Sequence, residues 1–233
     1  LSALCEKTGA DIDEVSKAVG MDKRIGKYFL NASVGFGGSC FKKDILNLVY
    51  LSKHYGLNQV ADYWHQVIKI NDYQVNRFSE KALNTLFDTV KNKSLTILGW
   101  AFKKDTNDSR ESASIQVSTN LLIEGANLRV FDPQVDKSRV INDLEDSLLK
   151  SGKSIKEISL MIKSQLNFHK NLNDCFIDSH AILILTEWDM FKEIDWELTY
   201  EKMVKPAFIF DGRRITDSNK LKKIGFNTYK IGT

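Results

Sequence analysis

Residues 58–90 contain neither glycine nor proline, and this uninterrupted stretch constrains the fold more than any other feature of the sequence. Mostly apolar side chains recur in it at spacings of three or four: Val60, Trp64, Val67, Asn71, Val75, Phe78, Ala82, Leu86 and Val90. This spacing predicts one helix of about 30 residues, ~45 Å long. We expect a helix of that length to link two domains and to pack against a second subunit. The alternative is a pair of helices joined by a kink.

The sequence before this helix predicts shorter helices. Residues 1–20 read as two helical pieces broken at Gly9 and Gly20, with Asp11 as N-cap and Glu14 completing a capping box. Residues 40–55 predict a further helix that ends at Gly56.

The pattern changes after residue 93, where short apolar runs alternate with helical segments. Residues 95–98 and 128–131 predict strands on either side of a helix over 109–125, which is a βαβ unit. Further strands are expected at 182–185 and 208–210, near 167–169, and at the sheet edge at 228–231, with helices at 136–150 and 154–164. The predicted fold is therefore α/β: a helical central (dimerisation) domain over 1–90 with a long connecting helix, then a Rossmann-like parallel-sheet domain over 91–233.

Composition restricts the class of function. A chain of 233 residues with 42% hydrophobic and 27% charged residues can bury ordinary cores. The net charge of +3 argues against nucleic acid as the main partner, and no apolar run approaches the length of a membrane span. The cysteines Cys5, Cys40 and Cys175 are few and widely spaced, so we expect neither disulfides nor a metal site, and a reducing cytoplasm fits.

A glycine-rich loop over residues 31–39 runs into a cysteine that opens a helix. Its glycines allow close approach of backbone to a ligand, and a helix N-terminus favours the thiolate of Cys40. Lys43 and Asp44 follow at i+3 and i+4 and therefore share one helical face with Cys40. Nucleophile, cation and carboxylate together form an active-site pattern. The alternative is a buried structural cysteine after an ordinary loop.

Three other motifs follow predicted strands, at residues 100–110, 186–189 and 211–214. Ligands of parallel sheets bind beyond the carboxyl ends of the strands, so a site is expected where these segments meet. After Gly99 the loop continues with bulky and cationic residues instead of the glycines of a dinucleotide fingerprint. Such side chains suit a nucleotide base and phosphates.

The segment Phe-Gly-Gly-Ser-Cys-Phe-Lys-Lys-Asp at 36–44 closely resembles the active-cysteine segment of UDP-glucose 6-dehydrogenases, members of the UDP-glucose/GDP-mannose dehydrogenase family. Segments 21–26, 99–106 with 110–112, 186–191 and 210–214 are similar to the same family in the same order. The family begins with an NAD-binding Rossmann domain, but no G-x-G-x-x-G motif is found here. The resemblance thus implies a C-terminal part lacking that domain. The alternative is a short protein that reuses two of the family's domains.

The resemblance implies an NAD-dependent two-step oxidation of UDP-glucose to UDP-glucuronate. Cys40 is expected to form a thiohemiacetal and then a thioester, while Asp44 orients or activates water. A fragment without the NAD domain is expected to be inactive alone. Two alternatives stay open: a nucleotide-sugar-binding and dimerisation module without turnover, and a dehydrogenase of another nucleotide sugar.

The resemblance also implies roles for individual residues and an oligomeric state. Contacts to the nucleotide sugar fall on Arg24, which reaches the neighbouring subunit's sugar, and on Phe29, Phe36, Gly37, Phe102, Lys103 and Arg213. Lys43 and Arg110 match positions that reach toward NAD. The protein is expected to be a homo-oligomer, a dimer or a multiple of dimers. For Lys104 we expect a solvated surface charge, for segment 186–189 a strand end and turn, and for Arg214 a ligand contact or a pairing with an acidic neighbour.

Overall fold

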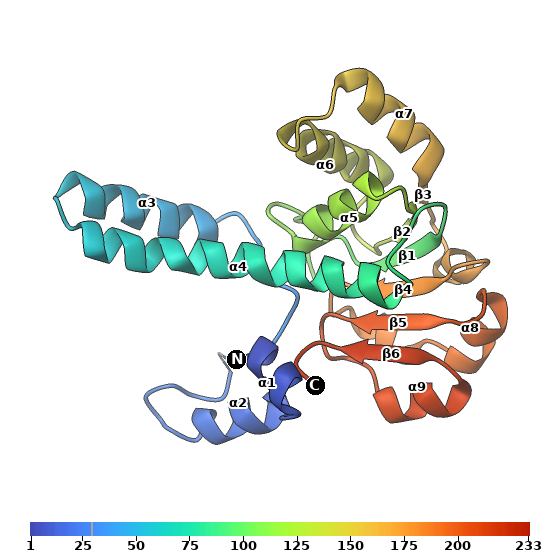
Figure 1. The fold of residues 1–233 in the computed structure, drawn as a ribbon, viewed down its shortest axis with the longest axis horizontal. Coiled ribbons are helices and arrows are strands. Elements are labelled where there is room, and N and C mark those ends of the chain that lie inside the picture. The colour runs from blue at the N-terminus through green and yellow to red at the C-terminus, as the bar shows by residue number, and fades with distance from the viewer. Residues whose placement is uncertain (29) are drawn as a thin grey trace.

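The structure is a computed structural model that describes residues 1–28 and 30–233 (Figure 1). The helices (α, with 3-10 turns as η) and strands are α1 (Ser2–Thr8), α2 (Ile12–Gly20), α3 (Phe41–His54), α4 (Asn58–Thr85), β1 (Ser94–Leu98), α5 (Ala113–Ile123), β2 (Asn127–Phe131), α6 (Lys137–Lys150), α7 (Ile155–Gln165), β3 (Leu166–Phe168), η1 (Leu172–Phe176), β4 (Ala181–Ile184), η2 (Asp189–Glu193), α8 (Trp196–Lys202), β5 (Phe208–Asp211), α9 (Ser218–Ile224) and β6 (Asn227–Lys230).

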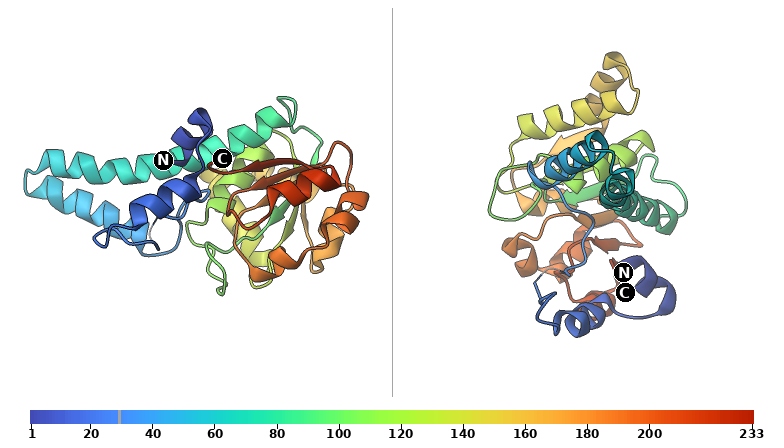
Figure 2. Two further views of the ribbon diagram at one scale, coloured as in Figure 1. Left: turned by 90° about the horizontal axis from the view of Figure 1, so that it is seen from below. Right: turned by 90° about the vertical axis from the view of Figure 1, so that its left-hand side faces the viewer.

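The predicted long helix is found as the single continuous helix α4, so the alternative prediction of two helices joined by a kink is wrong. The helix ends at Thr85, a few residues earlier than expected, because Phe87 and Asp88 adopt positive φ angles of 64° and 56° that no right-handed helix can continue. Its first half runs antiparallel to α3 and forms an arm that projects from the sheet (Figures 1 and 2). A small apolar core holds the arm together: Ile45, Val49, Ala61 and Ile68.

The second half of α4 leaves the arm and lies beside α5 (Figure 1). From there Val75, Phe78, Ala82 and Leu86 enter the main core around the sheet. One helix is therefore packed on α3 at one end and on the sheet at the other. The division of the chain at residue 90 stays a prediction.

The sheet has six parallel strands in the order β3-β2-β1-β4-β5-β6, which confirms the predicted α/β fold. The order reverses between β1 and β4, which are themselves paired. The connections from β1 to β3 and those from β4 to β6 run in opposite directions along the sheet. Because both sets are right-handed, α5–α7 cover one face of the sheet and α8–α9 cover the other. The strand at the carboxyl end of the chain, β6, is an edge strand, as expected. The seven-residue helices α8 and α9 were not predicted.

The two ends of the chain lie together in every view (Figures 1 and 2). The Glu6 carboxylate accepts hydrogen bonds from the Gly232 amide (2.7 Å), the Tyr229 hydroxyl (3.0 Å) and Arg77 (2.6 Å).

Asp11 caps α2 as predicted, but it accepts the amide of Asp13 (2.7 Å), and the capping box with Glu14 is wrong. In the described part of the chain, no helix combines the length and apolarity that crossing a bilayer requires.

Candidate active site

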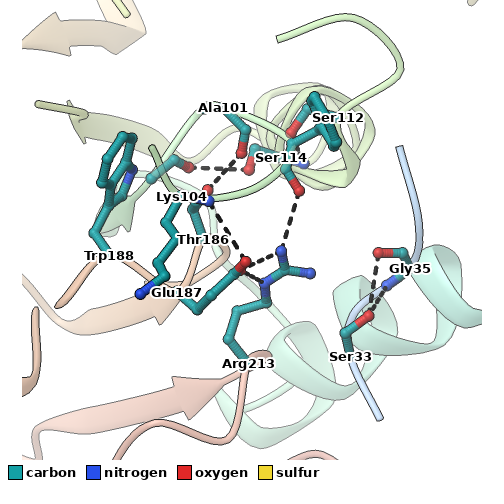
Figure 3. Close-up of polar contacts among 12 residues, drawn as sticks. Ser33, Gly35, Ala101, Lys104, Ser112, Ser114, Thr186, Glu187, Trp188 and Arg213 are labelled. Atoms are coloured by element: carbon teal, nitrogen blue, oxygen red, sulfur yellow. Dashed lines mark hydrogen bonds and ion pairs between the residues drawn. The ribbon is translucent and has the colours of Figure 1, made fainter. Parts of the chain in front are cut away.

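The carboxyl ends of β1, β4 and β5 meet through side chains (Figure 3). The Thr186 hydroxyl donates to the Ala101 carbonyl (2.6 Å), and Arg213 donates to the Glu187 carboxylate and to the Phe102 carbonyl (3.1 Å). The three segments expected to converge therefore lie in one place, at the point where the strand order reverses. Parallel sheets bind ligands at such points.

Gly99 permits this close approach of the β1 and β4 loops. Its φ is +94°, and an added Cβ would lie 2.3 Å from Cβ of Thr186. A side chain at this position would push the two loops apart. This glycine, which is not followed by the other glycines of a dinucleotide fingerprint, permits the contact between the two loops.

Asp132, directly after β2, is hydrogen-bonded to the loops that follow β1 and β4. Its buried carboxylate accepts hydrogen bonds from the amides of Trp100 (2.6 Å) and Ala101 (3.0 Å) and from Nε1 of Trp188 (3.1 Å). In dinucleotide-binding sheets an acidic residue in this region instead binds the ribose. The Asp132 carboxylate is already hydrogen-bonded within the protein and is therefore not free to bind a ribose in this way.

The glycine-rich loop docks onto the β1 side of this site. The Gly38 amide donates to the Arg110 carbonyl (2.8 Å), and an added Cβ at Gly37 would lie 2.4 Å from the Glu111 carbonyl oxygen. At Gly38 a Cβ would lie 3.0 Å from the Phe102 ring. The sequence-predicted positions Gly37, Phe102, Arg110 and Arg213 are therefore neighbours in the fold.

Two side chains of α4 hold the other side of this loop. The Asn71 amide group accepts from the Phe36 amide (2.8 Å) and donates to the Phe36 carbonyl (3.2 Å), while Gln74 donates to the Ser33 carbonyl (2.7 Å). The Phe36 ring packs edge-on against Phe41. Sequence reasoning missed both supports, although Asn71 was visible as a polar residue within an apolar stripe.

Cys40 is the N-cap of α3, and its thiol is exposed beside the Ser39 hydroxyl (3.5 Å). Lys43 and Asp44 are exposed in the first helical turn. The pKa of Arg110 is raised, chiefly by its hydrogen bond to Asp108 and to a lesser extent by nearby Cys40. By contrast, burial raises the pKa of Cys175 to about 12, so that thiol is unreactive.

A cavity of about 420 Å³ opens beside the strand ends. The glycine-rich segment forms one wall and the β1, β4 and β5 loops the other, with these lining residues: Asp13, Asn31, Ala32, Ser33, Lys104, Glu187, Lys192, Arg213, Arg214 and Ile215. Lys104 has a 38% exposed side chain that pairs with the exposed Asp189 (2.6 Å), which agrees with the surface charge expected for it. Lys104 and then Lys192 lower the pKa of Asp189 to about 2.

Arg214 serves a different purpose from its neighbour Arg213. It has a left-handed backbone (φ 56°), and its nearly buried guanidinium pairs with Asp11 (2.8 Å) and Asp13 (2.5 Å) of the α2 N-terminus. Of the two expectations for Arg214, pairing with acidic neighbours is the one the structure shows. This contact fastens α2 to the carboxyl end of β5.

The other residues predicted to contact the nucleotide sugar are Arg24, Lys103 and Phe29. Arg24 lies after α2 with its side chain 89% exposed and pairs with Asp22 (2.6 Å), so it does not reach the cavity of its own chain. Lys103 extends over the Phe102 ring, with Nζ 5.4 Å from the ring centre. Phe29 lies outside the described residues.

Comparison with known proteins agrees with this geometry. The model of the UDP-glucose/GDP-mannose dehydrogenase family's central domain matches residues 1–73, and that of its UDP binding domain matches residues 96–218. UDP-glucose 6-dehydrogenases of Pongo abelii and Drosophila melanogaster are 50% and 49% identical over the whole chain. The chain spans about half the length of these relatives, 46% and 48%.

Solved structures show the same arrangement. A UDP-glucose dehydrogenase from the archaeon Pyrobaculum islandicum is 25% identical and superimposes with a TM-score of 0.72, over 98% of this chain and 45% of that one. An NDP-N-acetyl-D-galactosaminuronic acid dehydrogenase from Methanosarcina mazei Go1, at 22% identity and a TM-score of 0.76, shares the fold over 99% of this chain and 46% of its own. From its helical arm to its sheet, the chain belongs to the UDP-glucose/GDP-mannose dehydrogenase family.

Proposed function

We propose that this chain is the cysteine-bearing and UDP-sugar-binding part of an NAD-dependent UDP-glucose 6-dehydrogenase, which oxidises UDP-glucose to UDP-glucuronate. The observation that carries the proposal is the docking of the Cys40 loop, through Gly37 and Gly38, onto the loop of Phe102 and Arg110. The Cys40 thiol is exposed, and Lys104, Lys192, Arg213 and Arg214 line the cavity at the strand ends. The names of the relatives that match the whole chain support the same reaction.

The cavity suits the nucleotide end of the substrate. Arg213, which lines the cavity, offers a charged donor to a diphosphate. We place the sugar near Phe36, Gly37, Phe102 and Lys103, the positions that the family resemblance assigns to the substrate. Arg24, exposed on its loop, is assigned to the neighbouring subunit's substrate.

Cys40 carries the chemistry that this chain supplies. NAD, when bound, accepts the hydride in each of the two oxidations. After the first oxidation, the Cys40 sulfur adds to the C6 aldehyde and forms a thiohemiacetal. Loss of the second hydride from C6 leaves a thioester. Water, oriented by Asp44, adds to C6. The carbon–sulfur bond then breaks, which releases the carboxylate and restores the thiol.

We place NAD largely outside the described residues: the Asp132 carboxylate is hydrogen-bonded within the protein, and the sequence has no G-x-G-x-x-G motif. Lys43 and Arg110 are exposed on the cysteine side and would contact a dinucleotide presented by another domain. We therefore propose that the chain alone binds nucleotide sugar without turning it over. In this proposal the isolated chain acts as a binding and dimerisation module, and the longer protein acts as an oxidoreductase.

We also propose a homo-oligomer built from dimers and a cytoplasmic location. The arm exposes large apolar side chains on α3 and α4, including Tyr50, Tyr63, Ile70 and Tyr73. Such a surface is typical of a subunit interface. The cysteines Cys5, Cys40 and Cys175 are all free, which suits a reducing compartment.

Calorimetric titration tests the binding half of this proposal. UDP-glucose and UDP should both bind the chain, and Lys103→Ala should weaken UDP by roughly 1.5–3 kcal/mol if one charge-assisted hydrogen bond is lost. Lys163→Ala, on the distant α7, is the charge-matched control. Absence of any UDP or UDP-glucose binding by the wild-type chain would refute the proposal.

A further inference from the structure

We infer that Glu187 is the positioning residue for Arg213: its carboxylate fixes the guanidinium so that the remaining donors face the diphosphate of the nucleotide sugar. The inference rests on the proposed function, because it concerns the ligand of the same cavity. It assigns a specific role to a residue whose segment, 186–189, was expected from sequence to shape a strand end and a turn, with direct ligand contact as the alternative.

The first argument is geometric. Nε of Arg213 donates to Oε2 of Glu187 (2.5 Å), and Nη2 pairs with the same oxygen and donates to the Phe102 carbonyl (3.1 Å). Two of the three guanidinium nitrogens are thereby directed at the protein. Figure 3 shows the third nitrogen pointing away from Glu187, toward the segment of Ser33 and Gly35. Ser33 and Arg213 line the same cavity, so this nitrogen faces the cavity.

The second argument is burial. The Arg213 side chain is only 11% exposed, whereas the carboxylate partner is 32% exposed. A guanidinium this deeply buried requires a counter-charge before any ligand arrives. Glu187 supplies that charge from the adjacent strand end, and the fixed fork loses little conformational freedom when a ligand binds.

The third argument is the distribution of charge around the cavity. The other cations that line it have partners of their own: Lys104 and Lys192 pair with Asp189, and Arg214 pairs with Asp11 and Asp13. Glu187 is the carboxylate that pairs with Arg213. Removing Glu187 therefore leaves the ion pairs of Lys104, Lys192 and Arg214 in place.

Glu187 also fixes the loop that carries Phe102 and Lys103. Its Oε1 accepts the Lys104 amide at 3.4 Å, while its partner Arg213 holds the Phe102 carbonyl. One carboxylate thus joins the ends of β1, β4 and β5. The negative charge of Glu187 also repels a diphosphate. If positioning dominates, removing Glu187 weakens UDP binding, and if repulsion dominates, removing it strengthens UDP binding.

Calorimetry of the chain with UDP and with uridine distinguishes these effects. We expect Glu187→Ala to weaken UDP binding about tenfold through lost pre-organisation and to leave uridine binding unchanged. Glu187→Gln keeps one acceptor oxygen and the shape of the side chain, so its affinity for UDP should lie between those of Glu187→Ala and the wild type. Glu193→Gln removes one charge from exposed η2 and serves as the matched control.

A double-mutant cycle separates positioning from a general structural role. If Glu187 acts through Arg213, adding Glu187→Ala to Arg213→Ala should cause no further loss of UDP affinity. An additive loss, unchanged affinity in Glu187→Ala, or tighter UDP binding in Glu187→Gln would each overturn the inference. If Glu187→Ala does not fold, the Gln variant decides alone. Failure of the wild-type chain to bind UDP would instead refute the proposed function.

Discussion

The amide of Gly38 donates a 2.8 Å hydrogen bond to the carbonyl oxygen of Arg110, and this contact joins the cysteine loop to the sheet. The two residues are far apart in the sequence and belong to different matched domains of the family. The position of the Cys40 thiol relative to the cavity therefore depends on how tightly the two segments approach.

Gly37→Ala tests that approach. An added Cβ would lie 2.4 Å from the Glu111 carbonyl oxygen, and a backbone atom cannot move aside as a flexible side chain can. We expect a loss of about 2 to 3 kcal/mol in the free energy of unfolding, measured in denaturant. Gly152→Ala is the control: nothing lies within 4 Å of its Cβ, so only the strain of its φ of +89°, about 1 kcal/mol, applies. Equal losses in both variants would contradict the steric argument.

Cys40→Ser tests the proposed nucleophile in an enzyme that joins this chain to an NAD-binding domain. A serine adds poorly to the aldehyde, and its ester hydrolyses slowly compared with a thioester. We expect release of UDP-glucuronate to fall by at least roughly a thousandfold. Cys5→Ala, which changes a buried thiol in α1, should retain turnover. Wild-type product release by the Cys40→Ser enzyme would make Cys40 a structural residue.

Arg214→Ala should loosen α2. The substitution removes the partner of Asp11 and Asp13 and also the donor to the Ile231 carbonyl (2.6 Å) after β6. We expect the free energy of local opening to fall by roughly 1 to 3 kcal/mol, seen as faster amide hydrogen exchange within residues 12–20. Lys192→Ala, which breaks an exposed pair with Asp189, should leave that exchange unchanged. Unaltered α2 exchange in Arg214→Ala would show that other contacts hold this helix.

His180 predicts how stability depends on pH. Burial, and then the charge of Lys93, lower its pKa below the ordinary 6.5, and its Nδ1 accepts the Ser94 amide (3.2 Å). A lowered histidine pKa means that the unfolded chain binds the proton more readily. The contribution of His180 is therefore retained above about pH 6.5 and is lost as the pH falls from there through the folded-state pKa.

We accordingly expect the free energy of unfolding to decrease between about pH 7.5 and about pH 5.5. His180→Gln should reduce this decrease without abolishing it, because burial also lowers the pKa of His169. His54→Gln, on the exposed surface of α3, is the control. A pH dependence that His180→Gln leaves unchanged would rule out this assignment.

The exposed arm predicts the assembly. Tyr63, Ile70 and Tyr73 are 67%, 60% and 51% exposed on α4, and two such faces would cover each other around a twofold axis. Light scattering should give the wild-type chain a mass of at least twice 26.6 kDa. Ile70→Asp should shift it to the monomer, whereas Ile155→Asp, 78% exposed on α7, should not. A wild-type mass of 26.6 kDa would contradict the dimer and remove the support for Arg24 in a neighbour's site.

Local patterns in the sequence were sufficient for the long helix α4, the apolar strands β1, β2, β4 and β5, and the helix that follows Cys40. Each of these is encoded by neighbouring residues, through a repeated apolar period or a glycine beside a helix start. The helices α8 and α9 were missed because seven residues are too few to establish a period. The early end of α4 was missed because positive φ at Phe87 and Asp88 carries no sequence signal.

The candidate site likewise has parts that the sequence predicted and parts that it did not. The sequence alone predicted Cys40, the glycines around it and the three strand-end motifs from their residue types and spacing, and the catalytic role of Cys40 stays a prediction. Only the tertiary structure decided that Asn71 supports the loop, that Asp132 is satisfied within the protein, and that Glu187 is paired with Arg213 while Arg214 is paired with α2. The physical reason is that a hydrogen bond or ion pair depends on positions in space. Residues distant in the chain reach those positions only after the sheet and α4 have formed.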